Sequence, residues 1–182
     1  MIYKLENGNT LTVKQDIDPQ SPREWDNLAK FICFHKRYSL GEKHEYKPID
    51  YANREELKAA IEKGEDVAVI MPIYLYDHSG ICIATTPFDC PWDSMLVGWA
   101  VVSKEAVRKE YSCKRITKAI IAKATSVIEC EVETYSQYLE GDVYGYEETD
   151  SEGNDVGSCW GFFGSNPNEN GMQDHISSKI VK

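Results

Sequence analysis

The sequence predicts a single α+β domain over residues 1–182, with a mostly antiparallel sheet packed by one long helix and two or three shorter helices. Three observations support this class. Strand-like apolar runs alternate with helical patterns, tight-turn residues separate neighbouring strand-like runs, and one helical pattern extends over about residues 114–139. The 182 residues, 42% hydrophobic and 27% charged, are typical of a globular chain that buries a substantial core.

The first third of the chain contains four readable elements and a loop. "YKLENGNTLTV" places Asn-Gly between two alternating segments, which predicts a β-hairpin. "SPREWDNLAKF" opens with Ser21, Pro22 and Glu24, the composition of a capped helix start, and "FICFH" then predicts a short strand. Residues 36–50 read as a loop, and "NREELKAAIEKG" predicts a helix with Asn53 as its N-cap.

Two apolar strands flank the sequence "DHSG". Asp77, His78 and Ser79 have the residue types of a catalytic triad, but a triad needs side chains that converge on one point. Adjacent residues of a tight turn point in different directions. The sequence therefore predicts a turn capped by Asp77, with His78 exposed at its tip.

The second half of the chain predicts one strand, two helices and a hairpin. "LVGWAVVS" reads as a strand, and Ser103 caps the short helix "KEAVRKEY" that follows. After the long helix, "DVYGYEET", the polar turn "DSEGND" and "SCWGFF" together predict a second hairpin. Residues 165–182 are expected to form a loosely held tail.

Metal, cofactor and membrane sites are not predicted. Cys33 and His35 would share one face of a strand, but no second pair of ligands completes a metal site. "DSEGND" has its Gly in the fourth position, where a calcium-binding loop needs it in the sixth. The longest apolar run, "VAVIMPIYLY", is too short to cross a bilayer, and the N-terminal residues do not resemble a signal peptide, so a cytoplasmic protein is expected.

The excess negative charge is confined to one part of the sequence. Residues 124–178 contain twelve acidic residues and no Lys or Arg, a formal charge of −12, while the rest of the chain carries +2. Because like charges repel phosphate, this region disfavours direct nucleic-acid binding. A basic groove on another protein is its natural complement, with aromatic residues as anchors. The alternative is a solvated acidic face that only aids solubility.

The predicted partner-binding residues are the acidic and aromatic side chains of this region. They are Glu129, Glu133, Glu140, Asp142, Tyr144, Tyr146, Glu147, Glu148, Asp150, Glu152 and Asp155.

Glu131 differs from the other acidic residues of the long helix. A helical wheel places it on the apolar face, where an ionised carboxylate must be paired or hydrogen-bonded, or must take up a proton. One interpretation is a core carboxylate held by an Arg, a Tyr or backbone groups, or a helix that bends before this point. The other is a ligand-binding or catalytic group, which would form a site with His78 and Asp93.

Several motifs together resemble a family. "YDHSG", "CPWDS", "GDVYG" and "SCWGFFG" resemble uncharacterised accessory proteins of phages and conjugative elements in Gram-positive bacteria. The resemblance implies expression inside a bacterial host and suggests, by analogy, an inhibitor of host defence of the anti-restriction or anti-CRISPR type. It brings no functional residues with it. Two other functions stay open: a small enzyme or ligand-binding protein, and a self-assembling structural protein of the element.

Overall fold

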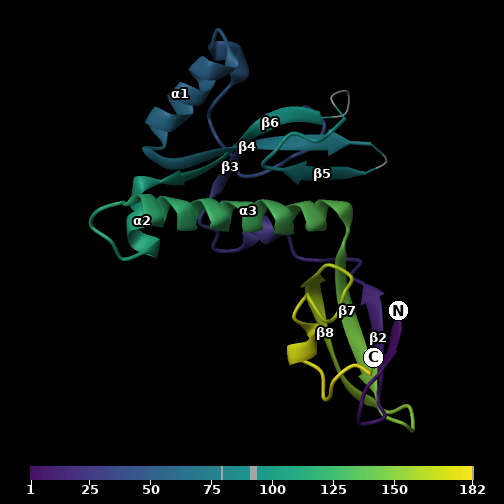
Figure 1. Cartoon of the computed structure of the whole chain (residues 1–182). Helices are drawn as coiled ribbons and strands as arrows, with labels where there is room; N and C mark the ends of the chain where they lie inside the picture. Colours follow the sequence, from purple (N-terminus) through teal and green to yellow (C-terminus); the bar gives the residue numbers. More distant parts are fainter. Residues whose placement is uncertain (79, 91–93, 182) are drawn as a thin grey trace. The chain divides into compact units, whose positions relative to one another are not determined.

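The computed structural model describes residues 1–78, 80–90 and 94–181 (Figure 1). In these residues the protein is α+β, with two four-stranded antiparallel sheets and three α-helices, one of them long, which confirms the predicted class. The chain divides into two compact units, each described separately below. Unit 1 comprises Met1–Ser21 and Gln137–Lys182, and unit 2 comprises Pro22–Ser136. The single domain expected over residues 1–182 stays a prediction.

The sheet of unit 1 consists of two hairpins. Its strands are β1 (Ile2–Lys4), β2 (Thr10–Gln15), β7 (Val143–Thr149) and β8 (Asp155–Phe163), in the order β1-β2-β7-β8. Both predicted hairpins are confirmed. In the second turn the Asp150 carboxylate accepts hydrogen bonds from the backbone N–H groups of Glu152 and Asn154, at 2.9 and 2.8 Å. Gly153 has a φ of 86°, a conformation that glycine adopts without strain.

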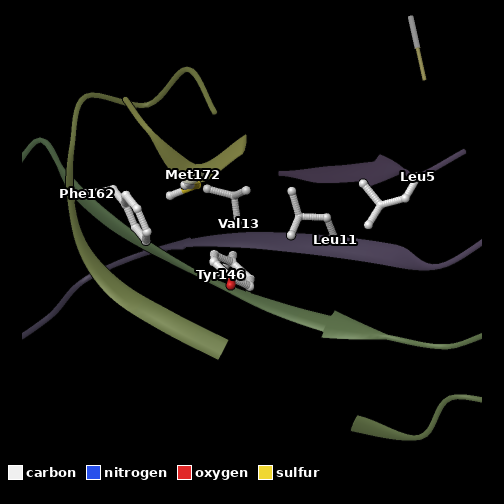
Figure 2. Packing of buried hydrophobic residues seen from close by; sticks show 6 residues of the cluster. All are labelled: Leu5, Leu11, Val13, Tyr146, Phe162 and Met172. Atoms are coloured by element: carbon white, nitrogen blue, oxygen red, sulfur yellow. The ribbon is translucent and has the colours of Figure 1, made fainter. Parts of the chain in front are cut away.

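The core of unit 1 lies on one face of this sheet (Figure 2). Because strand side chains alternate between faces, Leu11 and Val13 of β2 both enter the core. The 3₁₀-helix η3 (Met172–Asp174) adds the fully buried Met172 to the cluster. The buried members of the cluster are Leu5, Leu11, Val13, Tyr146, Phe162 and Met172.

Residues after Met172 also contact the strands of unit 1. The Tyr146 hydroxyl donates a hydrogen bond of 2.7 Å to the carbonyl of His175, and Ile180 forms a β-bridge with Leu5. The loosely held tail expected for residues 165–182 stays a prediction about mobility, while the structure gives this segment defined contacts.

The sheet of unit 2 has the order β3-β6-β4-β5. Its strands are β3 (Lys30–Cys33), β4 (Val67–Asp77), β5 (Ile81–Ala84) and β6 (Ser94–Ser103). The helices α1 (Arg54–Gly64) and α2 (Lys104–Glu110) begin at the predicted caps. Asn53 accepts from the N–H of Glu56 at 2.8 Å, and Ser103 accepts from that of Ala106 at 3.0 Å.

Helix α1 packs on one face of the unit 2 sheet. Its buried residues Leu57 and Ile61 form a cluster with Ile32, Trp99 and Val101. These side chains recur on α1 at the spacing of one helical face and on the strands at the spacing of one sheet face.

The long helix α3 (Lys118–Glu140) begins four residues later than the sequence predicts. Its residues Tyr135 and Ser136 contact the unit 2 sheet: Tyr135 lies 6.1 Å from Phe31 between ring centroids, and Ser136 accepts a 2.9 Å hydrogen bond from the N–H of Ile83. The packing of a single sheet against this one long helix stays a prediction.

The helix predicted from "SPREWDNLAKF" is limited to one 3₁₀ turn, η1 (Pro22–Glu24). The Asn27 side chain explains the early stop, because it donates hydrogen bonds to the carbonyls of Pro22 and Trp25, at 2.8 and 3.0 Å. A continuing helix would use those carbonyls itself. The backbone N–H of Leu28 is then satisfied by Glu131, so tertiary contacts replace the helical ones.

Candidate functional site

Glu131 is held by a specific set of partners within unit 2. Its side chain is only 13% exposed. The carboxylate accepts hydrogen bonds from the backbone N–H groups of Leu28 and Ala29, at 2.7 and 3.2 Å, and lies 3.3 Å from the Arg23 guanidinium. This geometry agrees with a paired core carboxylate.

Arg23 is the centre of this cluster. Its guanidinium pairs with Glu42 at 2.5 Å, donates a 2.6 Å hydrogen bond to the carbonyl of Ala29 and lies 3.7 Å from the centre of the Phe31 ring. The side chain is 7% exposed. One buried cation therefore serves two carboxylates that are 89 residues apart in the sequence.

Burial determines the protonation behaviour of Glu131. Loss of solvent raises the pKa of this carboxyl above its ordinary value, although the Leu28 N–H, the Arg23 charge and the Ala29 N–H each lower it. A raised pKa is a feature of catalytic carboxyls, but here it arises in a structural ion pair.

A cavity of about 290 Å³ lies beside Glu131. It is mostly apolar, and Trp25, Val127, Cys130 and Thr134 contribute to its lining. His78 is not among the lining residues. Asp93, the third member of the predicted ligand site, lies outside the described residues, so the structure separates His78 from this cavity and leaves the Asp93 part of the prediction untested.

The residues around the "DHSG" sequence have other partners. The Asp77 carboxylate pairs with Arg37 and accepts a 3.2 Å hydrogen bond from the Tyr38 hydroxyl. His78 is exposed and stacks on Tyr76, with ring centroids 6.1 Å apart. Ser79 lies outside the described residues. Among the described residues, neither Asp77 nor His78 therefore belongs to a catalytic triad.

The predicted partner-binding residues divide by exposure. Glu129 and Glu133 are exposed on the unit 2 part of α3. In unit 1, Glu140, Glu152 and Asp155 are exposed, and Asp142, Tyr144, Glu147 and Asp150 are half-buried.

Glu148 and Tyr146 differ from the surface position that the sequence predicts, because they are 2% and 4% exposed. Along β7 they point to the core face, where Glu148 lies opposite Leu11 and Tyr146 opposite Val13. The alternation of strand side chains is the signal that pairs these two residues on one face, but only the register identifies that face as the core.

The Glu148 carboxylate is satisfied inside unit 1. It accepts a 2.6 Å hydrogen bond from Asn9, a 3.0 Å bond from the Ser177 N–H, and a short bond from the Ser177 hydroxyl. Burial by itself raises the pKa of Glu148, but the bonds from Asn9 and Ser177 outweigh it and lower the pKa below its ordinary value. This carboxylate therefore ties the C-terminal segment to β7.

The negative charge separates by unit. Unit 1 contains 12 acidic residues and 4 Lys, a formal −8, whereas unit 2 contains 18 acidic residues and 16 Lys or Arg, a formal −2. Among the described residues, the ion pair Lys14–Glu147 is the one that lies within unit 1, and both its side chains are more than 40% exposed. Within the described part of unit 1, most carboxylates thus form no ion pair.

An exposed Trp accompanies these charges. Trp160 of β8 is 44% exposed, and its ring packs against Gly145, where a Cβ atom would lie 2.2 Å from the ring. Trp160 is not among the partner-binding residues that the sequence predicts. The signal in the sequence is Gly145 itself, because a glycine inside a strand often marks a place where another group lies close against the backbone.

Cys33 is one of the two residues, with His35, that the sequence offers as a possible pair of metal ligands. Burial, with a smaller effect from Glu42, raises the pKa of Cys33 to about 12, so its thiol stays protonated at neutral pH. In the part of the chain that the structure describes, no three His, Cys, Asp or Glu side chains are grouped as metal ligands would be.

None of the helices in the described ranges combines the length and apolar character that a membrane crossing requires. No family model, no curated protein and no solved structure matches this chain.

Proposed function

We propose that this protein is a non-enzymatic binding protein that uses unit 1 to dock on a basic surface of another protein. The observation that carries the proposal is the formal charge of −8 on unit 1, with a single internal ion pair among its described residues. A field of this kind attracts a basic partner and accelerates its encounter.

The proposed contact surface is narrower than the sequence alone suggests. It consists of the exposed and half-buried residues of unit 1, with Trp160 as the aromatic anchor, and it leaves out the buried Tyr146 and Glu148. This acidic surface is Glu140, Asp142, Tyr144, Glu147, Asp150, Glu152, Asp155 and Trp160. Glu129 and Glu133, which the sequence also predicts to bind a partner, are exposed residues of unit 2 and are not part of this surface.

The partner that fits this chemistry best is a protein with a basic groove for nucleic acid. Carboxylates that are not neutralised internally can occupy positions that phosphates would take in such a groove. In the setting that the motif resemblance implies, the partner is a nuclease or a restriction or CRISPR component of the bacterial host, and the protein acts in the host cytoplasm as its inhibitor.

The enzyme alternative receives less support. Its main candidate, Glu131, has a structural explanation in the Arg23, Leu28 and Ala29 contacts. His78 is exposed and does not line the cavity beside Glu131.

The test compares two variants with equal changes in charge. The unit 1 variant carries Glu140→Gln, Asp142→Asn, Glu152→Gln and Asp155→Asn, and the control carries Asp26→Asn, Asp50→Asn, Glu105→Gln and Glu110→Gln at exposed positions of unit 2. Each tagged protein is incubated with a lysate of a Gram-positive host and eluted with a salt gradient, and the captured proteins are quantified by mass spectrometry.

We expect the wild type and the control to retain the same basic protein and the unit 1 variant to lose it. Recovery by all three proteins would refute docking through unit 1. If the wild type retains only copies of itself, the self-assembly alternative replaces the proposal.

A further inference from the structure

A groove lies on the face of the unit 2 sheet that α1 covers in part. Two adjoining hollows of about 190 and 340 Å³ form it, and both are lined by Arg54, Leu96 and Trp99. Phe34 lines the smaller hollow and Tyr74 the larger one. The larger volume falls within the range in which proteins bind small molecules, about 300–1,000 Å³.

The floor of the groove is apolar and held in place by the core. Trp99 is 6% exposed, belongs to the α1 cluster and meets Phe34 edge to face, with centroids 6.2 Å apart. Pro72 lies opposite Trp99 on β4, beyond the end of the β5 pairing, which begins at Tyr74. A proline is tolerated there because β4 is an edge strand at that point. The early end of β5 leaves this side of the sheet accessible.

Arg54 supplies a cation that the fold does not use. It is exposed, and in the described part of the chain its guanidinium makes no hydrogen bond or ion pair. It is the first residue of α1, where a positive charge opposes the helix dipole. Neither helix stability nor an internal partner accounts for an arginine at this position.

Two other charged residues line the larger hollow. Lys58 lies 3.5 Å from Glu62, its neighbour one turn along α1, and is therefore partly neutralised. Glu55 also lines this hollow and would repel an acid. The charge available to a ligand is thus the guanidinium of Arg54, opposed by one carboxylate.

We propose that this groove binds a small aromatic carboxylate, with its ring against Trp99 and Tyr74 and its carboxylate on Arg54. The planar guanidinium matches a carboxylate with two parallel hydrogen bonds. Apolar surface combined with a few polar groups that fix the orientation is the usual design of a small-molecule site. This site is in unit 2 and does not depend on the docking function proposed for unit 1.

The experiment titrates the full-length ¹⁵N-labelled protein with three probes that share one ring system. Indole-3-acetate carries the negative charge, indole-3-acetamide is its neutral analogue, and tryptamine is positively charged. We expect saturable shifts of amide signals near the groove, at residues 54–58, 73–74 and 95–99. The acid should bind about fivefold more tightly than the amide, as expected for one partly exposed ion pair.

Three variants separate the charges. Arg54→Gln should make the acid and the amide bind equally, and Glu55→Gln should increase the affinity for the acid. Lys63→Gln is the matched control, because Lys63 is an exposed cation of the same helix that does not line the groove, and it should keep the wild-type preference. All three residues are exposed, so the variants should give the dispersed spectrum of the folded protein.

Four results would overturn the proposal. They are an acid that binds no better than the amide, tryptamine as the tightest probe, a preference that Arg54→Gln leaves unchanged, or no saturable shift with any probe. If the unit 1 variant still captured a protein partner, docking through unit 1 would be refuted but the outcome of this titration would not change. The two tests use different residues and different ligands.

Discussion

The Glu131 carboxylate lies 3.3 Å from the guanidinium of Arg23, which also pairs with Glu42. Two carboxylates thus share one buried cation, and backbone N–H groups supply the rest of their hydrogen bonds: Leu28 and Ala29 to Glu131, and Phe31 to Glu42. The cluster joins the segment before β3 to the middle of α3. Removal of its single cation is the sharpest test of its structural role.

Arg23→Met should strongly destabilise the protein. It leaves two buried carboxylates without a cation and removes the contact with the Phe31 ring, and breaking a buried pair in this way costs about 3–5 kcal/mol. The control is Lys14→Met, whose pair with Glu147 is exposed on both sides and is worth at most about 1 kcal/mol. Urea denaturation measures both. Equal losses for the two variants would contradict the central role of Arg23.

Glu131→Gln should change the pH dependence of stability in a defined direction. Burial raises the folded-state pKa of Glu131 above the unfolded value of about 4.3. The group's contribution is therefore fully present below the unfolded pKa and is lost as the pH rises through the folded pKa. The free energy of unfolding of the wild type, relative to the variant, should fall between about pH 4 and neutral pH. A denaturation series over this range tests it, and a relative stability that rises with pH would contradict it.

Glu148→Gln should show the opposite sign. The hydrogen bonds from Asn9 and Ser177 outweigh burial and lower the folded-state pKa of Glu148. Its contribution is present above the unfolded value of about 4.3 and is lost as the pH falls through the folded pKa. The advantage of the wild type over this variant should thus shrink below about pH 4. The same denaturation series measures both carboxylates, and a pH-independent difference between wild type and Glu148→Gln would rule out the lowered pKa.

Met172→Ala should show whether the C-terminal segment contributes to the core of unit 1. Met172 is fully buried against Leu11, Val13 and Phe162 (Figure 2), and truncation of a buried Met costs about 2–5 kcal/mol. The matched control is Met95→Ala, since Met95 is 51% exposed. Thermal unfolding compares the two. A loss no larger than that of the control would indicate that residues 165–182 are held as loosely as the sequence suggests.

The sequence by itself determined the local elements of this protein. Asn53 and Ser103 cap their helices because a side-chain oxygen before a helical pattern satisfies an N–H that the helix leaves free. The Asn-Gly turn predicted the first hairpin because only a few residues adopt its backbone conformation. The separation of charge was also readable, since it requires only counting. In each case the cause lies within a few neighbouring residues.

Only the tertiary structure decided which polar groups are internal. Glu148 and Glu147 are adjacent in the sequence, yet one is buried and the other pairs with Lys14 at the surface, because the register with β2 assigns the faces of β7. The helix expected after Ser21 stops after one turn, where Asn27 bonds the carbonyls of Pro22 and Trp25, and the N–H of Leu28 that follows is satisfied by Glu131, more than 100 residues away. The groove at Arg54 likewise needs strands and a helix from separate parts of the chain. Burial and hydrogen bonding depend on which distant segments meet, and no local pattern encodes that.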